Sequence, residues 1–360
     1  MRAVGRSGRY RGRVTHPTDV PAGRATIHDV ALAAGVSAST VSKVINGRYG
    51  VSAKTSEHVL RIVDDLGYAS SLIASSLRRG RTDVVGVLVA DFEPFALALL
   101  EGISAALHGS GYDLLSYAGS IADGPRHEGW ERRSLSRLGG TLIDGAILVT
   151  PTVEAAGSSV PVVAIDPHTG ESLSPAVAAD SLAGALQATR HLVELGHTRI
   201  AHVRGRIDLE SARLREEGYR RALAEAGIAF DPELVRAGGY STAETTEAAA
   251  ALLDLADRPT AVFAANDLSA LRTMEVAQER GLRIPDDLSI VGFDDIPAAA
   301  SSEPTLTTIR QPLREMGAEA VRLLLARLDG DAGAAPEHVQ LPTRLVVRGS
   351  TAPRRHRPGR

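Results

Sequence analysis

Short apolar runs alternate with helical segments over most of the chain, and this alternation is the feature that most restricts its fold. Seven runs have the length of buried strands, at 84–90, 112–118, 145–150, 160–166, 200–205, 260–267 and 288–295. Segments with apolar residues at helical spacing lie between them, for example at 182–196 and 212–227. Strands that alternate with helices form parallel sheets covered by helices on both faces. The pattern therefore predicts an α/β fold.

The predicted strands are too many for one comfortable sheet. We therefore expect two doubly wound parallel-sheet subdomains within residues 83–350, with a ligand in the crevice at the strand ends. The chain length of 360 residues also favours two or three domains. A content of 44% apolar residues is enough for substantial cores.

Several classes of protein are disfavoured by what the sequence lacks. No apolar run approaches the ~18–20 residues that span a bilayer. The basic start of the chain, MRAVGRSGRYRGR, is not followed by the apolar stretch of a secretory signal. There are no cysteines, which excludes disulfides, thiolate metal sites and cysteine nucleophiles. We expect a cytoplasmic, nucleoid-associated protein with no membrane partner.

Charge is distributed unevenly along the chain. Residues 1–81 hold 13 Lys and Arg against 5 Asp and Glu, whereas residues 82–360 hold 27 against 38. A basic N-terminal fifth on an acidic body is typical of a nucleic-acid-binding module joined to another domain. Residues 1–24 and 351–360 are interpreted as basic disordered tails. The DNA-binding interpretation therefore depends on residues 25–80.

Three short helices are predicted in residues 25–69. Thr26 and Asp29 have the spacing of a capping box at the start of the first helix, and Gly35 supplies a tight turn after it. Ser37 and Ser52 are N-cap residues for the second and third helices. A helix, a glycine turn and a second helix form a helix-turn-helix, although a three-helix bundle without DNA-binding function is the alternative.

The second predicted helix has an outer face suited to DNA. Val41, Val44 and Ile45 form a narrow apolar stripe that faces inward. Small polar groups and one cation allow a helix to lie close in a major groove. The residues that point outward are Ala38, Ser39, Thr40, Ser42, Lys43 and Asn46.

The run TIHDVALAAGVSASTVSKVINGRYGVSAKTSEHVLRIVDDLGYASSLIASSLRRG strongly resembles the DNA-binding headpiece of the lactose/galactose repressor (LacI/GalR) family, without gaps. The resemblance implies base reading by Ala38, Ser39 and Lys43, where alanine offers only a methyl contact to thymine. It also implies contacts to DNA phosphates from Thr26, Ser37, Thr40, Ser52 and Thr55.

Residues 70–79 resemble the hinge helix of the same family. The resemblance implies that Leu77, flanked by Ala74, is inserted between base steps in the minor groove and bends the duplex. This chain has Ser70-Ser71 where the family has Pro-Asn, which is a departure at the start of the hinge. Packing of Leu77 on its own domain is the alternative.

The body of the chain resembles the sensor domain of this family, which is related in fold to periplasmic sugar-binding proteins. The resemblance is carried by phrases such as LIDGAILVTP, HLVELGHTRIAHVRG, AVFAANDLSA and IPDDLSIVGFDDIP. It implies an N-subdomain of about 83–180 and 311–340 and a C-subdomain of about 181–310 and 341–350, so the chain crosses between them three times.

The same resemblance implies an effector cleft whose carboxylates and amide bind sugar hydroxyls, whose arginine donates in a fixed fork and whose aromatic rings cover an apolar sugar face. This chain has Glu93-Pro94-Phe95 where the family has Asn-Pro-Phe, and the loop after the first strand is one residue shorter than in the family. There are alternatives to these binding roles. Asp166 and Asp294 end strands and could cap the turns that follow, and Arg215 could be an exposed helix charge. The implied cleft residues are Asp91, Phe92, Phe95, Asp166, Arg215, Asn266 and Asp294.

The expected function is a homodimeric, sequence-specific transcriptional repressor that a small sugar releases from double-stranded operator DNA. A corepressor-dependent regulator or an activator of the same fold is the alternative, and a stand-alone sugar-binding protein is a remote one. Only Arg215 is clearly placed as a cation in the cleft, which favours a neutral polyol over a phosphate-bearing effector.

No cofactor, metal or enzymatic activity is expected. His191, His197 and His202 straddle a helix–loop–strand junction without metal-ligand spacing, and no GxSxG, Walker-type or GxGxxG signature follows a strand. The helix after Pro312 carries an apolar stripe that either contributes to a dimer interface or packs in the core. The stripe consists of Leu313, Met316, Gly317, Ala320, Val321 and Leu324.

Overall fold

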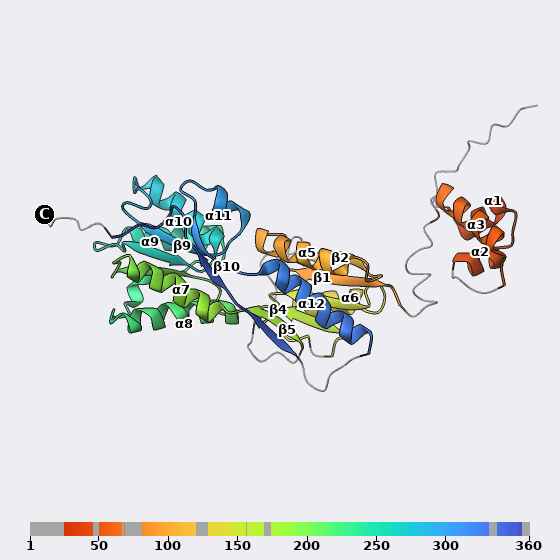
Figure 1. Ribbon diagram of the computed structural model, residues 1–360, viewed down its shortest axis with the longest axis horizontal. Helices are drawn as coiled ribbons and strands as arrows, with labels where there is room; N and C mark the ends of the chain where they lie inside the picture. The colour runs from red at the N-terminus through yellow and green to blue at the C-terminus, as the bar shows by residue number, and fades with distance from the viewer. Residues whose placement is uncertain are drawn as a thin grey trace, which may run out of the picture. The chain divides into compact units, whose positions relative to one another are not determined.

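The computed structural model describes residues 25–45, 50–66, 68, 81–119, 129–155, 157–168, 174–330 and 337–354. The chain separates into two compact units, residues 1–78 and 79–360 (Figure 1). Four sequence predictions lie outside the described residues: the tail 1–24, Asn46, and the hinge residues Ala74 and Leu77.

The first unit begins with the predicted capping box. In α1 (Ile27–Ala34), the Asp29 N–H donates to Thr26 Oγ1 at 3.4 Å, and the Thr26 N–H donates to Asp29 Oδ2 at 2.7 Å. Gly35 follows at a φ of 63°, where a residue without a β-carbon ends the helix at little cost. The start of α1 and the turn after it are therefore confirmed.

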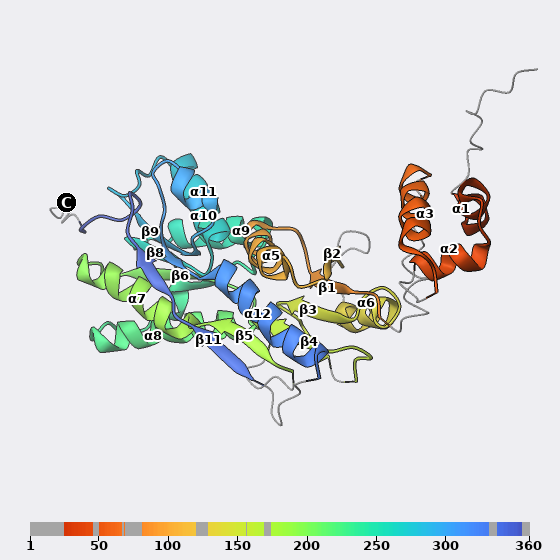
Figure 2. The ribbon, with the colours of Figure 1, turned by 45° about the vertical axis from the view of Figure 1, so that its right-hand side comes forward.

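Two further helices complete this unit, α2 (Ala38–Ile45) and α3 (Ala53–Asp65) (Figure 2). Ser37 Oγ accepts the Thr40 N–H and Ser52 Oγ accepts the Thr55 N–H, each at 3.1 Å, as expected of N-caps. The core between the helices is built on the fully buried Val30, Val41 and Val59.

The second unit contains two six-stranded sheets, and the first of them is parallel throughout, in the order β11-β5-β4-β3-β1-β2. We call this sheet and its helices the first subdomain. The helices α5 (Pro94–Leu107) and α12 (Leu313–Leu328) pack on one face, and α6 (Trp130–Leu138) packs on the other. The strands are β1 (Val84–Val89), β2 (Asp113–Ala118), β3 (Gly145–Val149), β4 (Val162–Ile165), β5 (Ala176–Ala179) and β11 (His338–Leu341).

The other sheet, with its helices, is the second subdomain, in the order β12-β10-β9-β8-β6-β7 with only β12 antiparallel. Its strands are β6 (Ile200–Arg204), β7 (Val235–Ala237), β8 (Ala261–Ala264), β9 (Ser289–Asp294), β10 (Thr307–Arg310) and β12 (Arg344–Val346). The helices α7 (Ser181–Glu194) and α8 (Glu210–Glu225) cover one face, and α9 (Thr242–Leu253) and α10 (Asp267–Glu279) cover the other; α11 (Pro297–Ser301) and a 3-10 turn (Pro232–Leu234) complete it (Figure 1).

The chain crosses between the subdomains after β5, after β10 and after β11. The α/β fold with two doubly wound parallel sheets is therefore confirmed. The prediction that the run 112–118 is a buried strand is wrong. The strand β2 forms there, but it is the last strand of its sheet and none of its residues is buried. The short strands β5, β7, β10, β11 and β12 were not among the predicted runs.

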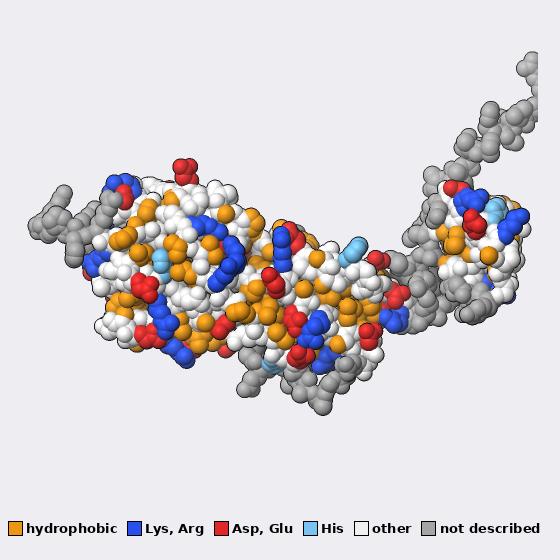
Figure 3. Space-filling view, viewed as in Figure 1, with side chains coloured by type: hydrophobic (Ala, Val, Ile, Leu, Met, Phe, Trp, Pro, Cys, Tyr) orange, Lys and Arg blue, Asp and Glu red, His pale blue; other side chains and the backbone are white. Residues whose placement is uncertain are grey.

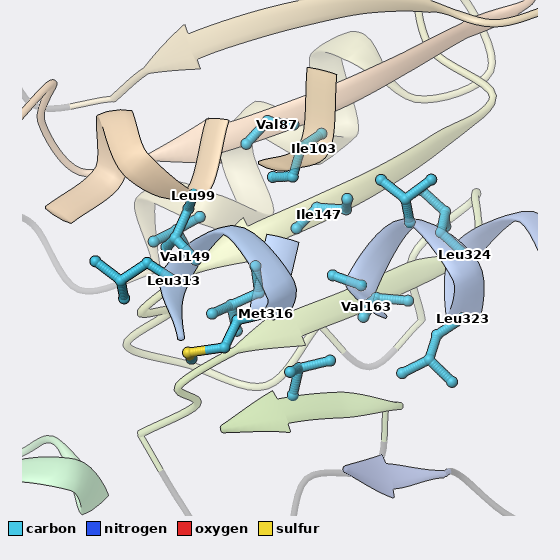
Figure 4. Packing of buried hydrophobic residues seen from close by; sticks show 14 of the residues in the cluster. Val87, Leu99, Ile103, Ile147, Val149, Val163, Leu313, Met316, Leu323 and Leu324 are labelled. Atoms are coloured by element: carbon cyan, nitrogen blue, oxygen red, sulfur yellow. The ribbon is translucent and has the colours of Figure 1, made fainter. Parts of the chain in front are cut away.

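The apolar stripe of α12 lies in the core of the first subdomain. Leu313, Met316 and Leu324 are buried against residues of α5 and of the sheet (Figure 4). Ala320 and Val321 belong to the same cluster. The suggestion that this stripe contributes to a dimer interface is therefore wrong, since these side chains are already covered within one chain.

The predicted C-terminal tail begins too early. The Ala352 N–H donates to Ser289 Oγ at 3.1 Å, and the Arg354 N–H donates to the Leu195 carbonyl at 2.8 Å. The described residues 351–354 therefore pack against the second subdomain, because the backbone there continues to find partners beyond β12.

Glycines let α5 and α12 approach each other closely. A β-carbon on Gly102 would lie 2.1 Å from the Arg314 carbonyl oxygen, and one on Gly317 would lie 2.5 Å from the Leu99 carbonyl oxygen. Real β-carbons do not come this close to backbone atoms. The two helices therefore pack backbone against backbone at this point.

We predict that Gly102→Ala lowers the free energy of unfolding by about 1–3 kcal/mol, because the helices must separate to admit the methyl group. Urea unfolding of the full chain, followed by circular dichroism, measures the change. Ser104→Ala, at an exposed position of the same helix, is the matched control and should leave the midpoint nearly unchanged. Equal midpoints for both variants would contradict the close packing.

Candidate functional site

A pocket lies where the carboxyl ends of strands from both subdomains meet. We call it the strand-end pocket. Thr150 and Asp166 follow β3 and β4 of the first subdomain, and Asp294 ends β9 of the second. Ligands of open α/β sheets bind in crevices of this kind. The other lining residues are Ala90, Glu93, Phe95, Leu209, Ser211, Arg215, Tyr240 and Asn266.

Four lining residues have left-handed backbone conformations. The φ angles are 46° at Thr150, 48° at Asp166, 60° at Tyr240 and 117° at Asp294. Residues with a β-carbon adopt such angles at a cost, and they cluster at binding sites where the surrounding structure imposes them. Six non-glycine residues have positive φ among those described, so most of this strain is concentrated in one pocket.

Arg215 is a buried cation on α8, not an exposed helix charge. Its side chain is 4% exposed, and Nη1 donates to the Ala265 carbonyl at 2.6 Å. The same nitrogen lies 3.8 Å from Asp294 Oδ1, and the guanidinium carbon lies 3.8 Å from the centre of the Phe293 ring. Its Nε is buried without a protein partner. Arg215 therefore keeps hydrogen-bonding capacity for a ligand.

Burial raises the pKa of two carboxyl groups in the strand-end pocket. Asp166 is 3% exposed, and burial raises its pKa to about 6 although Arg215 opposes the shift. Asp294 is 5% exposed, and burial raises its pKa to about 7 against Arg215 and the Gln311 amide, which donates to it at 2.7 Å. Near neutral pH the Asp166 carboxylate therefore mainly accepts hydrogen bonds, whereas the partly protonated Asp294 carboxyl group both accepts and donates them.

Asn266 contributes an amide from the start of α10. Its Oδ1 accepts the Ser269 N–H at 2.9 Å as the N-cap of the helix, so the amide NH₂ is the part that is left for a ligand. Phe95 adds an aromatic face from the start of α5. The pocket thus combines a fixed donor, carboxyl groups, an amide and an aromatic ring.

Five of the seven residues implied for the effector cleft come together in this pocket, and Asp91 and Phe92 do not. Asp91 Oδ1 accepts the Phe92 N–H at 2.7 Å, and the Phe92 side chain is 42% exposed. Ala90 and Glu93 are the residues of that loop that line the pocket instead. The five residues that come together are Phe95, Asp166, Arg215, Asn266 and Asp294.

Sequence reasoning missed Thr150, Tyr240 and Ser211. Thr150 occupies the same position after its strand as Asp166 does after β4, so the strand-end rule was a usable signal for it. Tyr240 follows the three-residue strand β7, which no apolar run marked. Glu93 was noticed only as a departure from the family pattern.

The first unit presents a separate polar surface at α2. Ser37 Oγ lies 2.8 Å from Ser39 Oγ and 2.9 Å from Thr40 Oγ1, and Ser52 Oγ lies 2.8 Å from Thr55 Oγ1. None of the described residues that were implied for DNA binding is buried. These residues are Thr26, Ser37, Ala38, Ser39, Thr40, Ser42, Lys43, Ser52 and Thr55.

Comparisons with known proteins match both parts of the chain. Residues 26–71 match the model of bacterial regulatory proteins of the lacI family, and residues 189–351 match a periplasmic binding protein-like domain. The regulator CelR of Thermobifida fusca is 36% identical over 347 residues, which cover 91% of this chain and 98% of CelR. The regulator DegA of Bacillus subtilis (strain 168) is 34% identical, over 92% of this chain and 99% of DegA.

The chain belongs to the lacI family of bacterial regulatory proteins. The lac repressor dimer bound to operator and the anti-inducer ONPF superimposes with a TM-score of 0.78 at 30% identity, over 92% of this chain and all of that one. A CelR–cellobiose complex gives a TM-score of 0.68 at 34% identity, over 91% and 100%. This lacI-family member is a DNA-binding transcriptional regulator, and its relatives are regulators, not enzymes.

In the described ranges, no three His, Asp or Glu side chains are grouped so that they could hold a metal ion. Over the same ranges, no helix is long and apolar enough to cross a membrane.

The raised pKa of Asp294 predicts that stability falls between about pH 4 and pH 7. The folded protein keeps this proton up to about pH 7, whereas the unfolded chain releases it near 3.8, so the stabilisation present at low pH is lost as the pH rises through 7. Asp294→Asn should remove a loss on the order of 4 kcal/mol, because one pKa unit corresponds to about 1.4 kcal/mol. Urea unfolding from pH 4 to pH 8 measures it, with the exposed Asp113→Asn as control. Parallel pH profiles for Asp294→Asn and wild type would contradict the raised pKa.

Proposed function

We propose that this regulator is a homodimeric repressor that binds operator DNA through α2 and is released when a small sugar occupies the strand-end pocket. The observation that carries the proposal is the pocket itself, in which the buried Arg215, Asp166 and Asp294 converge with the amide of Asn266. Such a set binds paired hydroxyl groups by donating to and accepting from each one.

The charge of the pocket supports a neutral polyol. Arg215 is the single Lys or Arg among the described lining residues, whereas Glu93, Asp166 and Asp294 are acidic. A phosphate-bearing effector would meet these carboxylates in a buried site, which is unfavourable. The related CelR forms a complex with cellobiose, which also supports a sugar effector for this chain.

The DNA contacts follow the headpiece assignment. Ala38, Ser39 and Lys43 on α2 read base edges in the major groove, and Ser42 and Asn46 also contact the DNA. Leu77 with Ala74 forms the minor-groove wedge. The residues proposed to contact phosphates are Thr26, Ser37, Thr40, Ser52 and Thr55.

Symmetry supports the dimer. Two headpieces on a two-fold axis read the two halves of a pseudo-palindromic operator. The lac repressor that this chain resembles is a dimer on its operator. Over the body of this chain hydrophobic and charged side chains are interspersed (Figure 3), and Leu97 on α5 is an exposed large hydrophobic residue available to a second copy. The dimer acts in the cytoplasm, at the nucleoid.

The release follows from differential affinity. A sugar that bridges groups of both subdomains stabilises one relative arrangement of them over others, and DNA binding is weakened if that arrangement disfavours the operator-bound state. A corepressor would stabilise the operator-bound arrangement instead. The sign of the sugar effect in a DNA-release assay distinguishes the two.

We predict that Lys43→Ala lowers operator affinity by about tenfold or more, because it removes a cation from the DNA-facing side of α2. Fluorescence anisotropy with an operator selected from a random duplex library, at several salt concentrations, measures the loss. Arg61→Ala removes an exposed cation from α3 and is the matched control. Equal losses for the two variants would argue against a specific role for Lys43.

We predict that Arg215→Ala abolishes release from operator by sugar while operator affinity is retained. The probe is the sugar that raises the melting temperature most in a thermal-shift screen, since a ligand of the folded state raises apparent stability. Arg221→Ala, an exposed position of the same helix paired with Glu217, is the control. A normal response of Arg215→Ala would contradict the assignment of the strand-end pocket.

A further inference from the structure

A second pocket adjoins the strand-end pocket. Asp166 and Ser211 line both pockets, and the second one extends from them between the start of α8 and the strands β5 and β11. We call it the side pocket. Because the two pockets share two wall residues from opposite subdomains, they form one cleft with two chambers.

The side pocket exists because small residues line one face of the first sheet. Along β5, Val177 points into the core with α12, whereas Ala176 and Ala178 line the side pocket. In the parallel pairing of β5 with β11, Ala178 lies beside Gln340, which also lines the pocket. The helix α6, on this side of the sheet, packs against β1 and β3. Figure 2 shows β5 and β11 side by side near the start of α8.

The two chambers differ in chemistry. The strand-end pocket holds Arg215, Asp294 and Asn266, which together recognise a unit with many hydroxyl groups. The side pocket has apolar walls of alanine methyl groups and Leu214, and it also has the polar side chains of Glu210, His338 and Gln340. The apolar walls cover an apolar sugar face, and the polar side chains can form hydrogen bonds with hydroxyl groups. No Lys or Arg is among its described lining residues, so the second chamber lacks the fixed cation of the first.

The junction between the chambers is polar and buried. Asp166 is 3% exposed, and its carboxylate accepts the Ala179 backbone N–H. A carboxylate has lone pairs for several donors, so Asp166 has capacity for ligand hydroxyls on both sides. The Ser211 hydroxyl faces the same junction from α8.

We propose that the effector is a disaccharide, with one sugar unit in the strand-end pocket, the other in the side pocket, and the glycosidic linkage beside Asp166 and Ser211. This proposal rests on the proposed function, because it takes the strand-end pocket as the sugar site.

The test uses the full-length protein and three matched pairs of sugars: glucose with cellobiose, galactose with lactose, and xylose with xylobiose. Isothermal titration gives the Kd of each. At least one disaccharide should bind about tenfold or more tightly than its own monosaccharide, a difference of about 1.4 kcal/mol. Ala178→Leu fills the side pocket and should cancel that advantage while the monosaccharide Kd stays the same.

Two controls keep the result interpretable. Ala224→Leu makes the same substitution on the exposed far end of α8 and should leave every Kd unchanged. Gln340→Trp, at an exposed position of β11, obstructs the same chamber and replaces Ala178→Leu if that variant does not fold.

The outcomes separate the two proposals. If a monosaccharide binds, Arg215→Ala abolishes that binding, and the second unit adds no affinity, the disaccharide inference is overturned while the sugar effector stands. A disaccharide advantage that survives both Ala178→Leu and Gln340→Trp also overturns the inference. If no sugar of the six binds, the sugar effector is contradicted and the inference falls with it.

Discussion

The strand-end pocket depends on one buried cation, Arg215. A buried charge is costly unless it is paired, and the guanidinium here is held by the Ala265 carbonyl, by the nearby Asp294 carboxylate and by the face of Phe293. The dependence is mutual. Burial raises the pKa of both Asp166 and Asp294, and the positive charge of Arg215 limits this rise. Removing the cation would leave two buried carboxyl groups without a partner of opposite charge.

The position of Arg215 is set by how its helix packs. A β-carbon on Gly218 of α8 would lie 2.6 Å from the Ala185 β-carbon and 2.7 Å from the Leu182 carbonyl oxygen, both on α7. This glycine therefore lets α8 lie directly on α7, three residues after Arg215 in the sequence. Tyr219 is fully buried and donates to the Ile200 carbonyl at 2.8 Å, which ties the same helix to β6. Helix packing in the second subdomain thus fixes the cation in the pocket.

Local sequence signals predicted local structure well. The capping box of Thr26 with Asp29 and the left-handed Gly35 formed as expected, since each depends on residues within one helical turn. The family resemblance implied Asp166 and Asp294 as cleft residues, and both line the pocket at which the ends of parallel strands converge. Asp91 and Phe92 do not line the pocket, since the Asp91 carboxylate accepts the Phe92 N–H and the Phe92 side chain is 42% exposed. The face that α12 buries depends on α5, which is far away in the sequence.

The pocket is suited to switching because both subdomains contribute residues to it. Thr150 and Asp166 come from the first subdomain, whereas Arg215, Asn266 and Asp294 come from the second. Two of the three crossings, those after β5 and after β11, are tied together, since the Thr343 hydroxyl donates to the Asp180 carbonyl at 3.0 Å and the Leu345 N–H donates to Gln187 Oε1 at 3.2 Å. A ligand that satisfies groups from both sides prefers one arrangement by the free energy of those contacts, and this preference is what an allosteric effector needs.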